Sequence, residues 1–200
     1  MENNLNKNET TRREKGTSPK SEIFAPYFAA DGEAKRPLST TIQKPLVEVA
    51  AILRNLQNFP FFFENLESVT SVSDKKSTWR FKNTNDLEMS LEIPMSIQFD
   101  IYEQGMIWQS EDGAGFKYSV AIQLEEAAAG RGTVVRMMVA YDNLAGEIAG
   151  KFEKLFGKDA LILSRKNLQR LKAFCETGHV PTTEGQSSGR DEDQTTETKH

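Results

Sequence analysis

The sequence has few of the residues from which catalytic and metal sites are built. Its 200 residues include one cysteine, Cys175, and two histidines, His179 and His200. A single cysteine excludes an internal disulfide bond, which is typical of chains that fold in a reducing compartment. Both histidines lie in or next to a polar C-terminal tail, so neither is expected to serve a nucleophile as its base. Metal-ligand spacing is missing too, so the sequence favours a non-enzyme and offers no catalytic residue, metal or cofactor.

Long apolar runs and concentrated positive charge are also missing. No stretch approaches the ~20 apolar residues that span a bilayer, and the N-terminal residues lack the apolar centre of a secretory signal. The net charge is −4, and the basic residues between Lys7 and Lys15 are interrupted by Glu9 and Glu14. Proteins that bind nucleic acid usually carry an uninterrupted basic patch. These absences predict a cytoplasmic protein with no nucleic-acid partner.

Large apolar side chains are almost missing from both ends of the chain. Residues 1–20 are mostly polar, and residues 181–200 contain no large apolar side chain. Such segments cannot bury enough surface to offset the ~1–2 kcal/mol per residue of backbone entropy lost on ordering. The sequence therefore predicts disordered polar tails at 1–36 and 179–200, on either side of one domain at 37–178.

The predicted domain begins with a short β-favouring run at 38–42 and an amphipathic helix at 45–58. Apolar residues such as Val49 and Leu53 recur in the second segment at helical spacing, which indicates one buried helix face. Pro60 follows and is expected to end this helix.

The stretch from 66 to 142 changes to an alternation of apolar and polar side chains. The clearest run is 87–101, where every second residue from Leu87 to Ile101 is apolar and the residues between them suit solvent. This pattern predicts a long strand with one buried side, and a bend, bulge or split at Pro94. Turn signals between the alternating runs indicate consecutive hairpins, and therefore an antiparallel meander.

Beyond residue 142 the pattern becomes helical as far as Thr177. Gly157 lies inside this pattern and is expected to kink or break the helix. At ~1.5 Å of rise per residue, this final helix is the predicted element long enough to cover the buried face of the sheet. Cys175 lies on its apolar face and is expected to be a small buried residue and not a reactive thiol.

Bulky side chains occupy the inward positions of the predicted sheet. They include Trp79, Phe99, Trp108, Tyr118 and Tyr141. Periodicity leaves two interpretations open, because these groups could fill a solid core or line a cavity. Periodicity alone favours the solid core.

Three stretches carry a resemblance to a known superfamily. They are 59–69 (FPFFFENLESV), then 107–135 with IWQS and GRGTVV, and 154–178 with KLFG, LQRLK and ETG. They resemble the START-like superfamily, also called SRPBCC. The narrower resemblance is to bacterial polyketide cyclase/dehydrase-type proteins, often described as coenzyme-Q-binding START domain proteins. It covers roughly 38–190 and is most specific from Lys154 onward.

The resemblance implies an α+β helix-grip fold, START-like or pollen-allergen-like, with a curved antiparallel sheet wrapped around a long C-terminal helix. It also implies a cavity between the sheet and that helix, which moves our interpretation from the solid core to the cavity. The run 87–101 departs from the family pattern, because it is longer, more apolar and contains Pro94. The residues expected to line the cavity and bind a ligand are Trp79, Phe81, Phe99, Trp108, Tyr118, Met137, Tyr141, Phe152 and Phe156.

Two functions from different classes follow from such a cavity. The leading hypothesis is non-catalytic binding or carrying of an apolar small molecule, lipid-like or quinone-like, whose surface is removed from water. The alternative is a polyketide-type cyclase or dehydratase, in which Tyr118 and Tyr141 donate protons or orient the substrate. A third hypothesis, an interaction module that uses the tails, rests only on their polarity. The sequence leaves the oligomeric state open.

The phenylalanine cluster at 59–63 has three interpretations. We expect first that it packs the short helical segment against the sheet. It could instead form a lip through which an apolar ligand passes, or make transient contact with a membrane while the ligand is exchanged.

Overall fold

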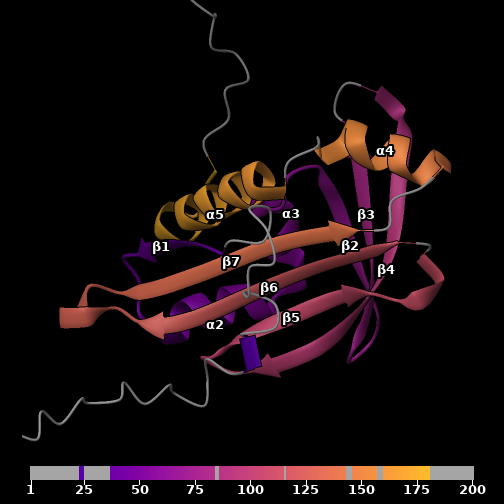
Figure 1. Cartoon of the computed structure of the whole chain (residues 1–200). Helices are drawn as coiled ribbons and strands as arrows, with labels where there is room; N and C mark the ends of the chain where they lie inside the picture. Colours follow the sequence, from indigo (N-terminus) through magenta and orange to yellow (C-terminus); the bar gives the residue numbers. More distant parts are fainter. Residues whose placement is uncertain are drawn as a thin grey trace, which may run out of the picture.

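A curved, open antiparallel sheet with helices on its inner face makes up most of the described chain (Figure 1). The structure is a computed structural model, and it describes residues 23–24, 37–83, 86–114, 116–142, 146–156 and 160–180.

The sheet has seven strands in the order β1-β7-β6-β5-β4-β3-β2, and every neighbouring pair is antiparallel. The alternation of apolar and polar side chains predicts this meander, and β1 adds to it at the edge beside β7. The strands are β1 (Leu38–Ile42), β2 (Leu66–Ser73), β3 (Lys76–Asn83), β4 (Asp86–Ile101), β5 (Gly105–Ser110), β6 (Lys117–Glu126) and β7 (Thr133–Asp142).

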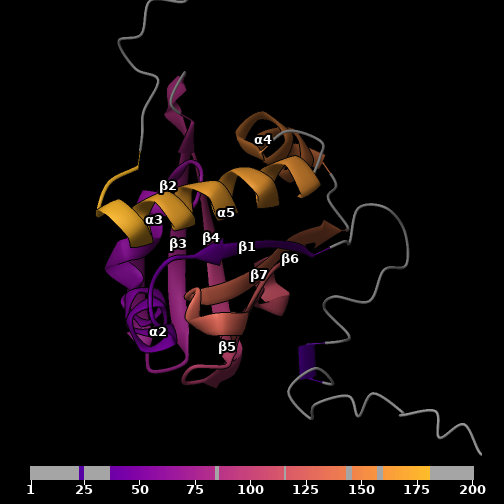
Figure 2. The same ribbon diagram turned by 90° about the vertical axis from the view of Figure 1, so that its left-hand side faces the viewer.

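Two pairs of helices cover the sheet. Helices α2 (Leu46–Arg54) and α3 (Phe59–Phe62) follow β1, and helices α4 (Gly146–Phe156) and α5 (Ala160–Thr177) follow β7. Helix α5 packs on β1, β7 and α3, whereas α4 packs on β3 and β4. Figure 2 shows α5 lying across the strands, with α3 beside one end and α4 at the other. This is the helix-grip fold that the sequence predicts.

The first predicted helix is shorter than expected, and the short helical segment predicted after it is present. Helix α2 ends at Arg54, and a 3-10 turn at Leu56–Asn58 leads into α3. Pro60 lies in the first turn of α3 and so helps to begin a helix, where we expected it to end one. A proline is tolerated there because the N–H that it lacks has no partner within the helix.

Two helices are described where the sequence predicts a final helix that is kinked or broken at Gly157. Helix α4 ends at Phe156 and α5 begins at Ala160, and Gly157 itself lies outside the described residues. Helix α5 has 18 residues, a length of roughly 27 Å. The sheet is therefore covered by two helices in series and not by one continuous helix.

Strand β4 is continuous through Pro94, and its irregularity lies further along. Pro94 is in register with Thr78 of β3, and its carbonyl accepts a hydrogen bond from the Glu111 N–H at 2.9 Å, just beyond the end of β5. The N–H that proline lacks would point toward β5, but β5 ends at Ser110 and does not pair with Pro94. Pro94 therefore removes no hydrogen bond between strands. A register shift lies instead between Ile97 and Phe99.

This shift overturns the prediction that Phe99 faces inward. A bulge adds one residue to a strand and reverses the side to which the following residues point. Ile97 pairs with Trp108 on the inner face, whereas Phe99 pairs with Ile107, whose side chain belongs to a separate cluster with Ala121 on the outer face. Phe99 is therefore not a cavity-lining residue.

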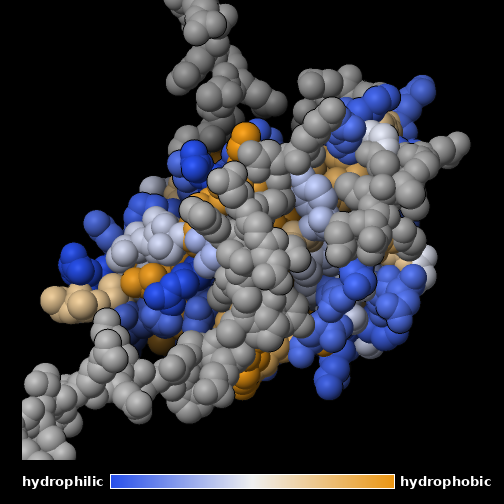
Figure 3. Space-filling view, in the orientation of Figure 1, coloured by the Kyte–Doolittle hydropathy of each residue, from blue (hydrophilic) through white to orange (hydrophobic). Residues whose placement is uncertain are grey.

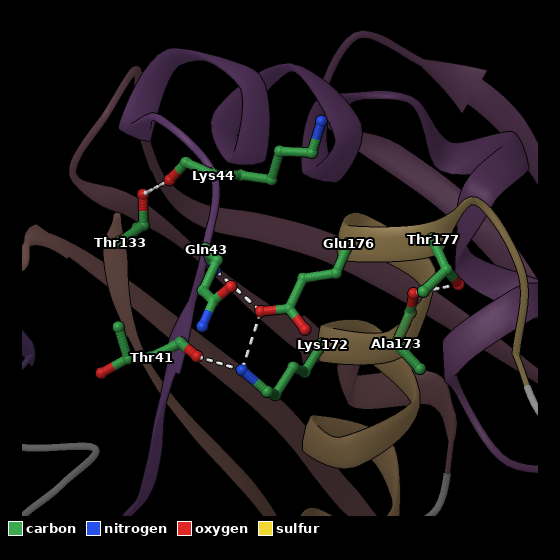
Figure 4. Close-up of polar contacts among 8 residues, drawn as sticks. All are labelled: Thr41, Gln43, Lys44, Thr133, Lys172, Ala173, Glu176 and Thr177. Atoms are coloured by element: carbon green, nitrogen blue, oxygen red, sulfur yellow. Dashed lines mark hydrogen bonds and ion pairs between the residues drawn. The ribbon is translucent and has the colours of Figure 1, made fainter. Parts of the chain in front are cut away.

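A network of hydrogen bonds fastens the end of α5 to β1 (Figure 4). The Glu176 carboxylate accepts from the Gln43 backbone N–H at 2.8 Å and from Lys172 Nζ at 2.7 Å. Lys172 Nζ also donates to the Thr41 carbonyl. These bonds fix the bend between β1 and α2, and so place α2 at the end of the sheet.

The predicted tails lie almost wholly outside the described residues. The exceptions are His179 and Val180 at one end, and Ile23 and Phe24 at the other, a short helical piece in which Phe24 is only 1% exposed. No described helix is long and apolar enough to cross a membrane.

Candidate functional site

The predicted ligand-binding residues other than Phe99 converge on the inner face of the sheet. Trp79 and Phe81 come from β3, Trp108 from β5, Tyr118 from β6, and Met137 and Tyr141 from β7. Phe152 and Phe156, four residues apart on α4, face them from the helix side. All of these side chains are buried except Tyr141, which is partly exposed.

The aromatic rings in this interior contact one another. Phe152 lies 5.8 Å from Tyr118 and 4.4 Å from Phe156, measured between ring centroids. Phe81 lies 4.8 Å from Phe156, and Tyr141 lies 4.6 Å from Phe152. Side chains in contact therefore occupy the space around Tyr118.

Tyr118 is the chemically distinctive residue of this cluster. Its side chain is fully buried, and its hydroxyl has no hydrogen-bond partner among the described residues. Burial raises the pKa of Tyr118 well above its ordinary value, with a smaller contribution from Tyr141, which is its cross-strand neighbour. Tyr118 is thus a neutral phenol whose hydroxyl can both donate and accept a hydrogen bond. A buried polar group without a partner typically costs about 1–3 kcal/mol.

An open pocket of about 410 Å³ lies between the C-terminal end of α2 and strands β2, β4 and β5. Its floor is apolar and buried, because Leu53, Met106 and Trp108 are 0%, 6% and 2% exposed. Its rim is polar and includes Arg54 and Asp100, which form an ion pair at 2.7 Å. Apolar and polar side chains line this pocket in similar number, and both kinds are found in pockets that bind small molecules.

Trp108 connects the pocket to the aromatic interior. Its ring lies 5.7 Å from Trp79, which in turn lies 6.5 Å from Tyr118. Both indole N–H groups have partners, since Trp79 donates to Ser77 at 3.0 Å and Trp108 to the Met106 sulfur at 3.4 Å. The floor of the pocket is therefore one end of a continuous aromatic wall.

Comparisons with known proteins give a fold but no family. No family model matches the sequence, and no curated protein matches it. The crystal structure of protein DR_A0006 from Deinococcus radiodurans matches with a TM-score of 0.55 and 24% identity, over 71% of this chain and 96% of that one. Two other crystal structures match at 10% identity and a TM-score of 0.52. They are protein CV1439 from Chromobacterium violaceum, over 70% of this chain and 96% of that one, and a conserved Geobacillus kaustophilus protein, over 68% and 91%.

The likeness is one of fold. At these identities it shows the helix-grip architecture and carries no ligand or reaction to this chain.

Trp108 is the lining residue of this pocket that the sequence predicted to bind a ligand, and the sequence did not predict the others as ligand-binding residues. Arg54 and Asp100 meet at the rim although they are 46 residues apart in the chain, and no local pattern predicts that pairing. The inward positions of Leu53 and Met106 follow from helical and alternating spacing. Those spacings identify buried residues but not the residues that border an open space.

The phenylalanine cluster is part of the interior. Phe59, Phe62 and Phe63 are buried, and Phe59 and Phe63 pack on Trp79 at 5.4 and 5.2 Å. Phe61 is 52% exposed and stacks on Phe174 of α5 at 4.9 Å. For Phe59, Phe62 and Phe63, these contacts confirm the interpretation that the cluster packs the short helix against the sheet.

Cys175 is buried on α5, as predicted. Burial, and secondarily the Glu176 carboxylate, raises the pKa of its thiol to about 12. The thiolate is the nucleophilic form of cysteine. Cys175 is therefore protonated near neutral pH and acts as a small apolar core residue.

A second, more open groove of about 940 Å³ lies beside the start of α2. It is lined by cations, namely Lys44, Arg131 and Lys172. Each of them is already engaged, since Lys44 pairs with Glu48 at 3.1 Å, Arg131 donates to the Ala128 carbonyl at 3.1 Å, and Lys172 joins the network in Figure 4. The groove therefore borders a structural network, in which each of these three cations already donates to an oxygen of the protein.

Proposed function

We propose that the protein binds a small, largely apolar molecule without chemical conversion, in the pocket between α2 and strands β2, β4 and β5. The observation that supports this function is the buried apolar floor of Leu53, Met106 and Trp108 below a polar rim. A ligand on this floor removes mainly its own apolar surface from water, at ~25 cal/mol per Å², because the floor side chains are already almost fully buried.

The rim suggests which polar atoms the ligand carries. Arg54 offers N–H donors beside Asp100, and the rim hydroxyls of Ser71 and Ser73 can also donate. Acceptor oxygens on an apolar body, as in a quinone or a fatty acid, match these donors. The pocket volume of about 410 Å³ lies toward the lower end of the range for small-molecule sites, which favours a ring or a short chain over a whole membrane lipid.

This proposal keeps the ligand class that the sequence predicts and changes its location. The predicted site lay between the sheet and the final helix, where the rings around Tyr118 contact one another. Among the predicted binding residues, Trp108 is the one that lines the pocket proposed here. The narrower resemblance to coenzyme-Q-binding START domain proteins agrees with a quinone-like ligand, and we include that ligand class in the proposal.

The first experiment is extraction of the purified protein with organic solvent, followed by mass spectrometry of the extract. We expect a quinone-like or fatty-acid-like molecule in a fixed ratio to the protein. Its identity then selects the probe for binding measurements.

A charge placed at the lip of the pocket tests the location. Val72 lines the pocket and is 67% exposed, so Val72→Glu adds a charge there without disturbing the core. The matched control is Ile162→Glu on α5, where the side chain is 52% exposed. We expect a short-chain benzoquinone to quench tryptophan fluorescence in the wild type, because Trp108 forms the floor. Val72→Glu should weaken this binding about tenfold or more, which is ~1.4 kcal/mol.

The control defines what would contradict the proposal. Ile162→Glu should bind the quinone as the wild type does. Equal binding by both variants, with quenching retained, would place the quinone elsewhere in the protein. If the extract contains no bound molecule and the quinone does not quench the fluorescence, the proposed binding function is wrong.

The cyclase or dehydratase alternative has one observation in its favour, the unpartnered hydroxyl of Tyr118. It requires a substrate to reach that hydroxyl through the aromatic contacts around it. The raised pKa of Tyr118 also makes it a poor proton donor near neutral pH, because efficient acid catalysis needs a pKa near the working pH.

A further inference from the structure

The outer face of the sheet carries an apolar patch formed by three neighbouring strands. Phe99 of β4 pairs with Ile107 of β5, and Ile107 pairs with Ala121 of β6. We call these three residues the outer patch. They lie on the side away from the helices, where an antiparallel sheet normally presents polar groups to water.

Phe24, one of the two described residues before residue 37, lies on this patch. Phe24 packs on Phe99, Ile107 and Ala121, and its ring meets the Phe99 ring edge to face at 5.0 Å and 79°. Phe24, Ile107 and Ala121 are each 1% exposed, as deeply buried as core residues. Figure 1 shows the short indigo segment against the sheet beside β5, and Figure 3 shows hydrophobic surface at the same lower edge of this face.

Of the two described residues in this segment, Phe24 makes the contact. Ile23, the neighbour of Phe24, remains 42% exposed although it is also large and apolar. A single buried aromatic ring beside an exposed neighbour is the arrangement of an anchor residue in a pocket.

We infer that the outer patch is a docking site for an aromatic side chain, and that Phe24 of the same chain is its occupant. The 12 residues between Phe24 and Pro37 can reach roughly 40 Å at ~3.3 Å per residue. Strands β7 and β6 separate β1 from β5, a distance of roughly 14 Å at ~4.8 Å per strand. The linking chain is therefore long enough for docking within one molecule.

The folding unit accordingly begins before residue 37, and Phe24 shields a patch that would otherwise face solvent. An exposed apolar sheet surface of this kind is a common site of association between proteins. Docking of Phe24 keeps the outer patch from such contacts.

Equilibrium unfolding of full-length point variants tests the anchor. Phe24→Ala should lower the folding equilibrium constant about tenfold or more, because the patch loses its cover. Ile23→Ala, the matched control, should leave the constant unchanged, because that side chain is exposed. Equal effects of the two variants would overturn the assignment. Phe24→Leu, which keeps an apolar side chain, should retain most of the wild-type constant.

A double-mutant cycle tests the partner. Phe99→Ala should weaken folding less in the Phe24→Ala background than in the wild type, by a factor of about three or more, because the two rings are in contact. Additive effects would show that Phe24 does not dock on Phe99.

Sedimentation velocity distinguishes Phe24 docked on the outer patch of its own chain from Phe24 docked on that of a second copy. We expect the wild type to sediment as a monomer over a wide concentration range, and Phe24→Ala to self-associate through the uncovered patch. A wild-type dimer that Phe24→Ala dissociates would assign the docked ring to a second copy and overturn docking within the chain.

Discussion

At the scale of single residues, Tyr118 separates the two hypotheses for the interior. A tyrosine that transfers protons should have a pKa close to the working pH. Burial instead raises the pKa of Tyr118 above the ordinary value of 10.0, so the phenol keeps its proton. Its hydroxyl is suited to hydrogen bonding and not to proton transfer. A phenol that keeps its proton can orient a bound molecule but is a poor acid for cyclisation.

Tyr118→Phe should be at least as stable as the wild type near neutral pH. The substitution removes a buried hydroxyl that has no partner, so the expected change in unfolding free energy is between zero and about +1 kcal/mol. Above pH 10 the unfolded chain releases the phenol proton while the folded chain retains it. Stability therefore falls as pH rises through that region, and the variant should lose part of this dependence.

Urea unfolding at pH 8 and pH 10.5 measures both effects. Tyr102→Phe is the control, because Tyr102 is 44% exposed and the variant should keep the wild-type dependence on pH. A loss of more than about 1 kcal/mol in Tyr118→Phe at pH 8 would show that the hydroxyl has a partner in the folded protein.

At the scale of elements, the turn before β7 holds β1 in place. Gly132 has a φ of +104°, and a Cβ there would lie 2.1 Å from the carbonyl oxygen of Ile42. The next residue, Thr133, donates its hydroxyl to the Lys44 carbonyl at 2.8 Å (Figure 4). Close approach at Gly132 thus allows the turn to hold the bend that leads into α2.

Gly132→Ala should destabilise the protein by roughly 3 kcal/mol or more, because it adds a backbone clash to an unfavourable φ. Gly130→Ala is the matched control, since Gly130 has a φ of +65° but open space around its missing Cβ. We expect that variant to lose only about 1–2 kcal/mol, the cost of a left-handed φ. Similar losses in the two variants, measured by urea unfolding, would show that the close contact with Ile42 is unimportant.

At the scale of the whole molecule, local patterns predicted the architecture better than the site. Alternation placed Trp79 and Tyr118 on one face, and Gly157 marked the division of the final helix, because both signals lie within a few residues. The bulge that turns Phe99 outward has no such signal, since it depends on pairing with β5. Phe24 lies in an apolar stretch at 23–30 (IFAPYFAA) inside the predicted polar tail, so the sequence carried a signal for burial that the average composition of the tail concealed.

The pocket was missed for a related reason. It is bordered by the end of α2 and by parts of β2, β4 and β5, and the space between them depends on how those elements meet. Periodicity predicts which side of each element is buried, but not whether the buried sides close on one another or leave a gap. Around Tyr118 the aromatic side chains contact one another, whereas Trp108 borders the open pocket.

The last prediction concerns the m-value, because a ligand in a preformed pocket and a ligand that opens the core leave different amounts of surface exposed in the folded protein. A benzoquinone probe at about one hundred times its Kd should raise the unfolding free energy by about 2.7 kcal/mol if it binds only the folded protein. The urea m-value should stay constant, because the surface exposed on unfolding hardly changes. Val72→Glu should show a much smaller gain at the same probe concentration. A probe that instead separated the rings around Tyr118 would expose buried surface in the folded state and lower the m-value, which would place binding in the interior.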